Sequence, residues 1–395
     1  MARLWDKGKS ADDLVLRFTV GDDPTLDARL VPHDIRASKA HARTLERGGY
    51  LTHEETGAIC KGLDSVRKAF SEGKWSISFE EEDAHTAIEN RLTEKIGDLG
   101  GKVHLGRSRN DQILVAVRLF LIEQCATARS RSNSVRAALA DLAARYPDTP
   151  LPGYTHMQRA MPSSVALWAG AFESELKYSE SLLDGAERLA RLSPLGSAAG
   201  YGTPGLALDR SFTAKLLGMK VHVPVTAPQL SRGKAESALA FALLTLLNDL
   251  GRLASELCLY NTSEFGFVRL PDEMTTGSSI MPQKRNPDVF ELVRGHSSQA
   301  ASDLTAILAV TAKMTSGYHR DLQLIKPALF RLVDRFSTCF DVMARALAGI
   351  EFSASTTQLA MTSELNAAEH AFELVKAEGI SFREAYRRVA REITT

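Results

Sequence analysis

The sequence predicts an all-α protein built around a bundle of long central helices. Two observations predict this class. The middle of the chain is a succession of long helical patterns, and polar hinges with Gly and Pro, rather than alternating strand patterns, separate them. Each pattern covers about 25 residues, or about 40 Å at 1.5 Å per residue, so each helix needs long neighbours. The expected starts lie near Asp111, Pro162 and Ala235, and at Pro287 for a helix that runs towards Met314.

The helix expected from Ala235 is apolar around most of its circumference. This pattern predicts burial on nearly all sides, most simply in a bundle that other subunits extend. Its longest apolar run, Ala238 to Leu247, is too short to span a bilayer. We therefore expect a multi-subunit helical core and no membrane association.

Changes in pattern along the chain predict three domains. Residues 1–106 carry shorter helical patterns and paired glycines, and indicate a small helical domain. Residues 107–352 form the central long-helix bundle. A run of Ser and Thr after Phe352 marks the boundary to a small helical domain over residues 353–395.

Composition favours a cytoplasmic enzyme that acts on a small molecule. Lys plus Arg and Asp plus Glu both number 48, which gives no general attraction to nucleic acid or membranes. The N-terminus lacks the apolar core of a secretory signal, and the four cysteines lack CxxC spacing and fit reduced, buried thiols. Zinc-binding, Walker A and dinucleotide-binding motifs are missing as well, so we expect no metal and no cofactor.

The polar segment GSSIMPQKRNP, from Gly277 to Pro287, is the strongest candidate for chemistry. It combines two hydroxyls, a lysine and an amide between two helical patterns. Asn286 before Pro287 predicts an N-cap followed by proline at the first helical position. Free N–H groups at such a helix start favour anions, so a carboxylate ligand is expected.

Two more polar clusters stand at expected helix starts: GRSRNDQ (Gly106 to Gln112) and GYTHMQRAMP (Gly153 to Pro162). If the long helices alternate in direction, the starts of the second and fourth share one end of the bundle and that of the first lies at the other. A single chain could not easily assemble all three clusters. We therefore expect neighbouring subunits to complete the site.

Taken together, these clusters resemble the blocks of a known family. GSSxMPQKxNP is similar to the signature loop of the fumarase/aspartase superfamily, whose fold has three domains around a long-helix bundle. HLGRSRNDQ, GYTHMQRAMP and YHRDLQLIK (Tyr318 to Lys326) resemble argininosuccinate lyases within it, and so do LWDKG near the start and FREA near the end. The resemblance implies a homotetramer that reversibly cleaves argininosuccinate to arginine and fumarate in arginine biosynthesis, without a cofactor.

The resemblance also implies roles for individual residues. Ser278 is the expected base, and its oxyanion would need nearby N–H groups, cations and exclusion of water. A turn-capping role is more plausible for Ser279. Lys284 stabilises the aci-carboxylate intermediate. His156, held in a turn-rich loop, pairs with Glu291 and either assists proton delivery or holds a reactive water.

Substrate-binding residues follow from the same resemblance. The fumarate end is expected at Ser108, Asn110, Thr155 and Asn286, and the arginine end at Arg109, Tyr318, Gln323 and Lys326. Simpler roles stay open: Asn110 and Asn286 are also candidate helix caps, and Tyr318 is a candidate packing residue. His85 matches a family block, but a buried structural role is at least as plausible.

Some positions depart from the family pattern. Asp27 matches a usual aspartate, but Asp23 stands where a serine is usual; Leu105 replaces a threonine and Arg285 a lysine. These departures bear on substrate selectivity more than on elimination. A fumarate-releasing lyase for another N-substituted aspartate is therefore the nearest alternative, and a non-catalytic structural homologue is a second.

Overall fold

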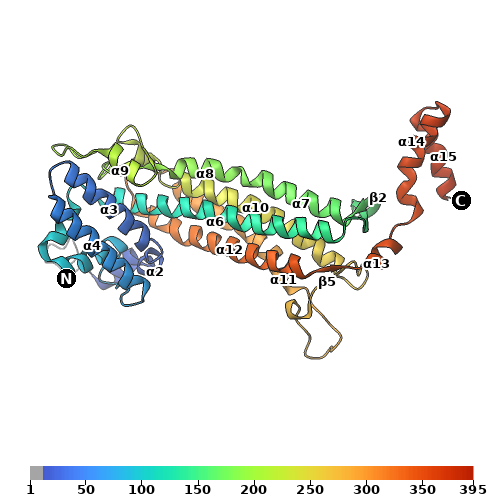
Figure 1. Ribbon diagram of the computed structural model, residues 1–395, viewed down its shortest axis with the longest axis horizontal. Coiled ribbons are helices and arrows are strands. Elements are labelled where there is room, and N and C mark those ends of the chain that lie inside the picture. The colour runs from blue at the N-terminus through green and yellow to red at the C-terminus, as the bar shows by residue number, and fades with distance from the viewer. Residues whose placement is uncertain (1–11, 395) are drawn as a thin grey trace. The chain divides into compact units, whose positions relative to one another are not determined.

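The computed structural model describes residues 12–394, and the LWDKG segment lies outside them. Helices make up most of the elements, and the strands form three two-stranded pairs, which confirms the all-α prediction (Figure 1). The contacts divide the described chain into two compact units. The first comprises the chain up to Ala128 with Leu182–Leu243 and Ala301–Asp334, and the second comprises Arg129–Ser181, Leu244–Ala300 and Arg335 onwards.

Four long helices extend through the unit boundaries. They are α6 (Arg109–Arg145), α10 (Lys234–Tyr260), α11 (Asp288–Thr311) and α12 (Ile325–Gly349). Three of them match the predicted helices, whereas α12 was not predicted. The expected boundaries near residues 106 and 352 stay predictions, because the contact pattern divides the chain at other positions.

The first unit has an N-terminal core where α3, α4 and α5 pack together around Leu45, Leu63 and Leu92. Local caps set the helix starts. Thr52 and Glu55 form a reciprocal capping box at α4. The other elements of this unit are α1 (Asp13–Val20), α2 (Asp23–Asp27), α3 (Val31–Arg47), α4 (His53–Ser71), α5 (Ala84–Ile96), η1 (Gly97–His104), α8 (Leu182–Ala190), β3 (Leu192–Ser193), α9 (Arg210–Leu216), β4 (Lys220–Val221), η2 (Ala227–Leu230) and η4 (Arg320–Leu324).

In the second unit, a β-hairpin replaces the start of the helix predicted near Pro162. Strands β1 (Pro150–Thr155) and β2 (Gln158–Ser164) pair antiparallel, and α7 (Val165–Glu180) begins only after them. The Ser164 hydroxyl caps α7 by accepting from Leu167 N–H. The predicted helix near Pro162 therefore exists, but it begins three residues later and breaks at Ser181, before α8.

The remaining elements of the second unit include a second antiparallel strand pair, in which Val268 faces Phe352. The segment between β5 and α11 forms an extended loop that protrudes from the helices (Figure 1). These elements are β5 (Val268–Arg269), η3 (Asp272–Met274), β6 (Glu351–Phe352), α13 (Ala354–Leu359), η5 (Ser363–Asn366), α14 (Ala367–Glu378) and α15 (Phe382–Thr394).

Helix α10 buries one side along its length, with Leu246, Leu250 and Leu257 fully buried, while Phe241 keeps 51% of its surface exposed. By length and composition, this helix would be able to cross a membrane, but half of its most apolar window is buried, as in core helices that pass the same test. The sequence predicted that α10 is buried on nearly all sides, but within one chain it is buried on one side only.

Candidate active site

The twelve predicted site residues divide between the two units. Ser108, Arg109, Asn110, Tyr318, Gln323 and Lys326 belong to the first unit, and Thr155, His156, Ser278, Lys284, Asn286 and Glu291 to the second. Each unit presents a hollow lined by some of its own members. The two groups are therefore described in turn.

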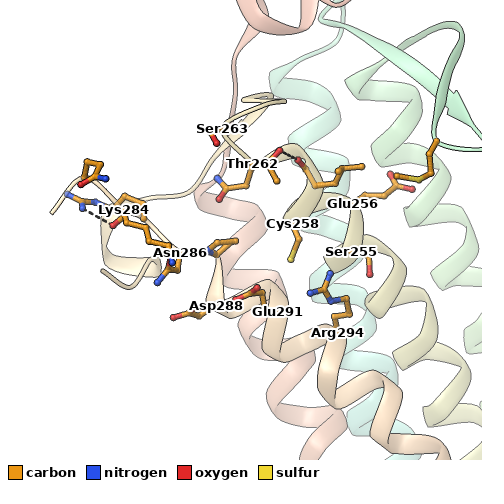
Figure 2. Close-up of a pocket in the computed structure, with 16 residues that line it drawn as sticks. Ser255, Glu256, Cys258, Thr262, Ser263, Lys284, Asn286, Asp288, Glu291 and Arg294 are labelled. Carbon is orange, nitrogen blue, oxygen red and sulfur yellow. Dashed lines mark hydrogen bonds between the residues drawn. The ribbon is translucent and has the colours of Figure 1, made fainter. Parts of the chain in front are cut away.

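The second unit holds a cleft of about 1130 Å³ between the signature loop, the end of α10 and the start of α11. Three of the residues predicted for the site, Lys284, Asn286 and Glu291, line it. Figure 2 shows Glu291 and Arg294 on the side of α11 that faces Cys258. Basic and acidic side chains both line the cleft, which suits a ligand with charged groups.

A backbone clamp closes the base of the signature loop. The Asn286 N–H donates to Thr276 C=O over 2.8 Å, and Thr276 N–H donates to Asn286 C=O over 3.3 Å. The Thr276 hydroxyl also hydrogen-bonds the Asp288 carboxylate at the start of α11. The loop from Gly277 to Arg285 is thus held at both ends.

The predicted N-cap role of Asn286 is wrong. The Pro287 C=O accepts the first helical bonds of α11, from Phe290 and Glu291 N–H, so Asn286 lies one residue before the cap. Its side-chain amide instead donates to the Thr276 hydroxyl over 3.2 Å.

The Ser278 hydroxyl oxygen accepts two backbone hydrogen bonds, from Ile280 N–H over 3.3 Å and from Met281 N–H over 3.2 Å. This is the turn-capping arrangement that the sequence favoured for Ser279. Two N–H donors aimed at one oxygen stabilise negative charge on it, as a serine base requires. The two N–H donors that form the turn at Ser278 are therefore also the donors that the predicted chemistry needs.

His156 occupies the tip of the β1–β2 hairpin. His156 and Met157 are the two loop residues, with φ of 51° and 63°. Positive φ at both central positions is the pattern of a type I′ turn, a demand usually met by Asn and Gly. His156 and Thr155 are exposed, and Met157 lines the cleft. The turn thus holds the imidazole at an exposed tip in a conformation that few residues favour.

An aromatic cluster supports the far wall of the cleft. Trp168 lies between Tyr260 and Phe352, with ring centroids 6.0 and 5.6 Å away. Its indole N–H donates to the Glu256 carboxylate over 2.5 Å, and Glu256 lines the cleft. Burial and the nearby Glu256 carboxylate raise the pKa of Tyr260. This packing fixes the end of α10 where the cleft begins.

In the first unit, Arg109, Asn110, Tyr318 and Gln323 line a smaller hollow of about 130 Å³. Three acids, Asp23, Glu82 and Asp83, line it as well, beside a second arginine, Arg320. Arg109 Nε lies 3.2 Å from Asp83 Oδ2, and Arg109 Nη1 donates to Glu82 over 3.3 Å. The Gln323 amide donates to Thr19 and Val20 C=O. We name these residues the acidic hollow; Glu82 and Asp83 pair with Arg109, and Asp23 pairs with Lys326.

Lys326 differs from the expectation of direct substrate contact. It is 4% exposed, and its Nζ lies 2.7 Å from Asp23 Oδ1 and 2.6 Å from Asp27 Oδ1. Burial opposes its charge, but the two aspartates raise the pKa of Lys326. Burial raises the pKa of Asp23 to about 6, with the Asp27 and Asp83 charges adding to it. The lysine charge is thus already matched within the fold.

Ser108 does not line the acidic hollow; instead, it forms hydrogen bonds at the start of α6. Its hydroxyl accepts from Asn110 N–H over 3.3 Å, and its own N–H donates to Asp111 over 3.0 Å. The second Asp111 oxygen accepts from Gly196 and Ala198 N–H over 3.1 and 2.9 Å. Burial raises the pKa of Asp111 to about 6 despite these bonds. Asp111 therefore ties the start of α6 to the 196–198 turn.

His85 is buried, as the structural alternative predicted. Its Nδ1 pairs with the Asp34 carboxylate, while Nε2, also buried, has no hydrogen-bond partner among the described residues. Although burial opposes the charge, the Asp34 carboxylate raises the pKa of His85. His85 also lines the acidic hollow, so its pairing with Asp34 helps to fix that side of the hollow.

Comparisons with known proteins bear on the family of this chain. The profile of a family described as lyase matches residues 8–301. An argininosuccinate lyase of Sorangium cellulosum is 43% identical over 99% of this chain and 90% of its own length. One from Thermotoga neapolitana is 40% identical over 99% of this chain and 98% of its own.

The chain belongs to the argininosuccinate lyase family.

Solved structures place this family member in the expected fold. An EDDS lyase in complex with formate is 27% identical, with a TM-score of 0.81 over 98% of this chain and 76% of its own. A class II fumarase from Schistosoma mansoni has a TM-score of 0.80 at 18% identity, covering 95% and 87% of the two chains, and bears on the fold alone. The predicted resemblance to this superfamily is confirmed.

Several lining residues of this family member were missed by sequence reasoning. Glu256 and Arg294 line the large cleft, and Glu82 and Asp83 line the acidic hollow. The run EEED over residues 80–83 was a readable signal for acidic walls, although charge runs are usually solvated faces. Cys258, expected to be buried, is half-buried and lines the cleft. Among residues 12–394, no group of three metal-ligating side chains lies together.

Proposed function

We propose that this protein is a carbon–nitrogen lyase that reversibly cleaves argininosuccinate to arginine and fumarate, and that it serves arginine biosynthesis in the cytoplasm. The observation that carries the proposal is the clamped signature loop, in which Ser278 Oγ accepts two N–H groups and Lys284 lines the adjacent cleft. Argininosuccinate lyases that match 99% of this chain support the choice of substrate.

In the proposed reaction, Ser278 as its alkoxide removes the proton beside the carboxylate of the succinyl group. The electron pair moves into that carboxylate and gives a dianionic aci-carboxylate, which Lys284 stabilises. The pair then forms the double bond of fumarate as the carbon–nitrogen bond breaks. The leaving guanidino nitrogen gains a proton, with His156 and Glu291 assisting.

The substrate-binding roles follow the family resemblance. Ser108, Asn110, Thr155 and Asn286 serve the fumarate end, and Arg109, Tyr318 and Gln323 the arginine end. The acidic hollow supports this assignment, because its carboxylates and its two arginines, Arg109 and Arg320, together suit the α-ammonium and α-carboxylate of the arginine portion. Lys326 acts there through the two aspartates that it holds.

We also propose a homotetramer with shared active sites. Large apolar side chains stay exposed along the long helices of one chain: Phe241 on α10 is 51% exposed, Leu308 on α11 49% and Leu167 on α7 68%. Such faces favour association with further helices. Light scattering gives the mass in solution; a monomer would contradict the proposal, and Phe241→Glu should weaken the assembly.

A lyase for another N-substituted aspartate is the second candidate, because Asp23 replaces the usual serine in the acidic hollow. The purified protein is incubated separately with argininosuccinate, adenylosuccinate and aspartate, and fumarate is followed by its ultraviolet absorbance. Argininosuccinate should yield fumarate and arginine without added metal or nucleotide. Turnover of another substrate, with none of argininosuccinate, would reject the proposal, and no turnover at all would favour a non-catalytic homologue.

A further inference from the structure

Besides the acidic hollow, the first unit has a cavity of about 260 Å³, which we name the α10 cavity. Residues of α6, α8, β3, η2 and the start of α10 surround it. Its apolar lining comes from Leu189, Leu192 and Leu230 and from two alanines, and its polar lining is described below. None of the twelve predicted site residues lines this cavity, so the proposed elimination does not account for it.

Arg118 on α6 brings a buried cation to the α10 cavity. The residue is 1% exposed and hydrogen-bonds three acceptors, which are the Leu192 C=O, the Ser231 hydroxyl over 2.5 Å and His222 Nδ1 over 3.3 Å. These acceptors use three of the five N–H groups of a guanidinium. Its Nε is screened from solvent and has no hydrogen-bond partner among residues 12–394. A buried donor without a partner is unfavourable, so a ligand with acceptor oxygens is expected.

His222 supplies a further donor to the cavity lining. Burial, with the charges of Arg118, Arg210 and Lys234 adding to it, lowers the pKa of His222 to about 4, so the imidazole is neutral at pH 7. Since a guanidinium can only donate, His222 Nδ1 accepts from Arg118. The proton of the neutral ring is then on Nε2. Both Arg118 and His222 therefore offer N–H groups, which favours an acceptor as the ligand.

The charges around the cavity also favour an anion. Lys234 lines the cavity and is the first residue of α10, where the positive end of the helix dipole disfavours a cation. The Glu236 carboxylate raises the pKa of Arg118 against the effect of burial, and the Arg232 charge lowers it again. Glu236 does not line the cavity. Several cations thus share one nearby carboxylate, and the cavity lies in a net positive region.

The size and the lining of the cavity indicate which anion fits. At roughly 30 Å³ for each water-sized group, the cavity has room for about eight non-hydrogen atoms. Leu189 and Leu230 are 37% and 60% exposed, so they lie at the mouth, whereas Arg118 lies inside. A carboxylate matches the guanidinium fork, and a short apolar chain attached to it would cover the leucines.

We propose that the α10 cavity binds a short-chain monocarboxylate, with its carboxylate on Arg118 and its chain against Leu189 and Leu230. This inference does not depend on the proposed function, because the cavity shares no residue with the proposed active site. Its ligand joins α6 to the start of α10 and should stabilise the folded protein.

Calorimetry with hexanoate, a carboxylate of the size that fits, tests the proposal on the full chain. The matched ligand is hexanamide, which has the same shape and no charge. Hexanoate should bind with a Kd of about 1 mM or tighter, and hexanamide at least about 10-fold more weakly. Saturating fumarate should not displace hexanoate. Equal binding of the two ligands, no binding of hexanoate, or its displacement by fumarate would overturn the proposal.

Two variants locate the binding in the cavity. Leu230→Glu puts a carboxylate at its mouth, and Arg118→Met removes the cation; each should weaken hexanoate at least about 10-fold. The matched control is Leu14→Glu on α1, an exposed leucine outside the cavity, which should leave the affinity unchanged. Circular dichroism checks the fold, and Leu230→Glu, at an exposed position, carries the test if Arg118→Met does not fold. Unchanged affinity in a folded variant would contradict the assignment.

Discussion

Removing the Asp111 carboxylate should loosen the start of α6 and the binding residues beside it. Asp111→Ala deletes the acceptor of three backbone N–H groups, from Ser108, Gly196 and Ala198, at 3.0, 3.1 and 2.9 Å. At about 1 kcal/mol for each bond, the local loss is about 3 kcal/mol. Since about 1.4 kcal/mol is a factor of ten, these amides should exchange with solvent about 100-fold faster.

Hydrogen–deuterium exchange read by mass spectrometry on peptides covering 106–112 and 194–202 measures this effect. The KM for argininosuccinate should rise as well, because Ser108 and Asn110 lose their fixed geometry. The matched control is Asp141→Ala, an exposed acid on the same helix whose bond is to Arg145 one turn away; it should change neither peptide. Exchange of both peptides within about threefold of wild type would refute the role of Asp111 as a tie.

Two further predictions concern assembly and pH. If neighbouring chains complete the site, mixing inactive Ser278→Ala and inactive Asn110→Asp proteins under subunit exchange should restore activity. The reason is that about a quarter of the randomly assembled sites carry neither change. Hybrids that form but stay inactive would exclude shared sites. Because the pKa of Asp23 is raised from 3.8 to about 6, its contribution to stability is lost as pH rises through that range. The melting temperature of Asp23→Asn relative to wild type should therefore rise between pH 4 and 7. The corresponding gain in relative unfolding free energy is at most about 3 kcal/mol. A difference that does not change with pH would contradict the assignment.

The sequence predicted the helical class because the long helices carry uninterrupted local patterns. The starts of α6, α10 and α11 lie within two residues of polar clusters or caps that can be read directly. The hairpin at Pro150–Ser164 was missed because its strands do not alternate and its turn uses His156 and Met157 instead of Asn and Gly. Helix α12 was missed although its pattern was readable, since Phe336 and Phe340 are buried one turn apart.

A local motif was enough to predict Ser278, Lys284 and Asn286 as site residues, because a single loop holds all three. How the charged side chains pair could not be predicted, because the pairs join distant parts of the sequence. Lys326 is 299 residues from the Asp27 carboxylate that it binds, so no local pattern could show that its charge is matched. The approach of Arg232 to Tyr318 likewise depends on how distant segments pack. Pairing between charged residues that are far apart in the sequence determines which cations remain available to a ligand.

Turnover of Ser278→Ala tests the central claim most directly. If Ser278 is the base, the variant should lose about three or more decades of kcat for argininosuccinate. It should still bind substrate in calorimetry, since the binding groups in the two hollows remain. The matched control, Ser279→Ala, changes the exposed neighbouring hydroxyl and should stay active. A Ser278→Ala protein that keeps near-normal turnover would contradict the account and leave His156 as the next candidate base.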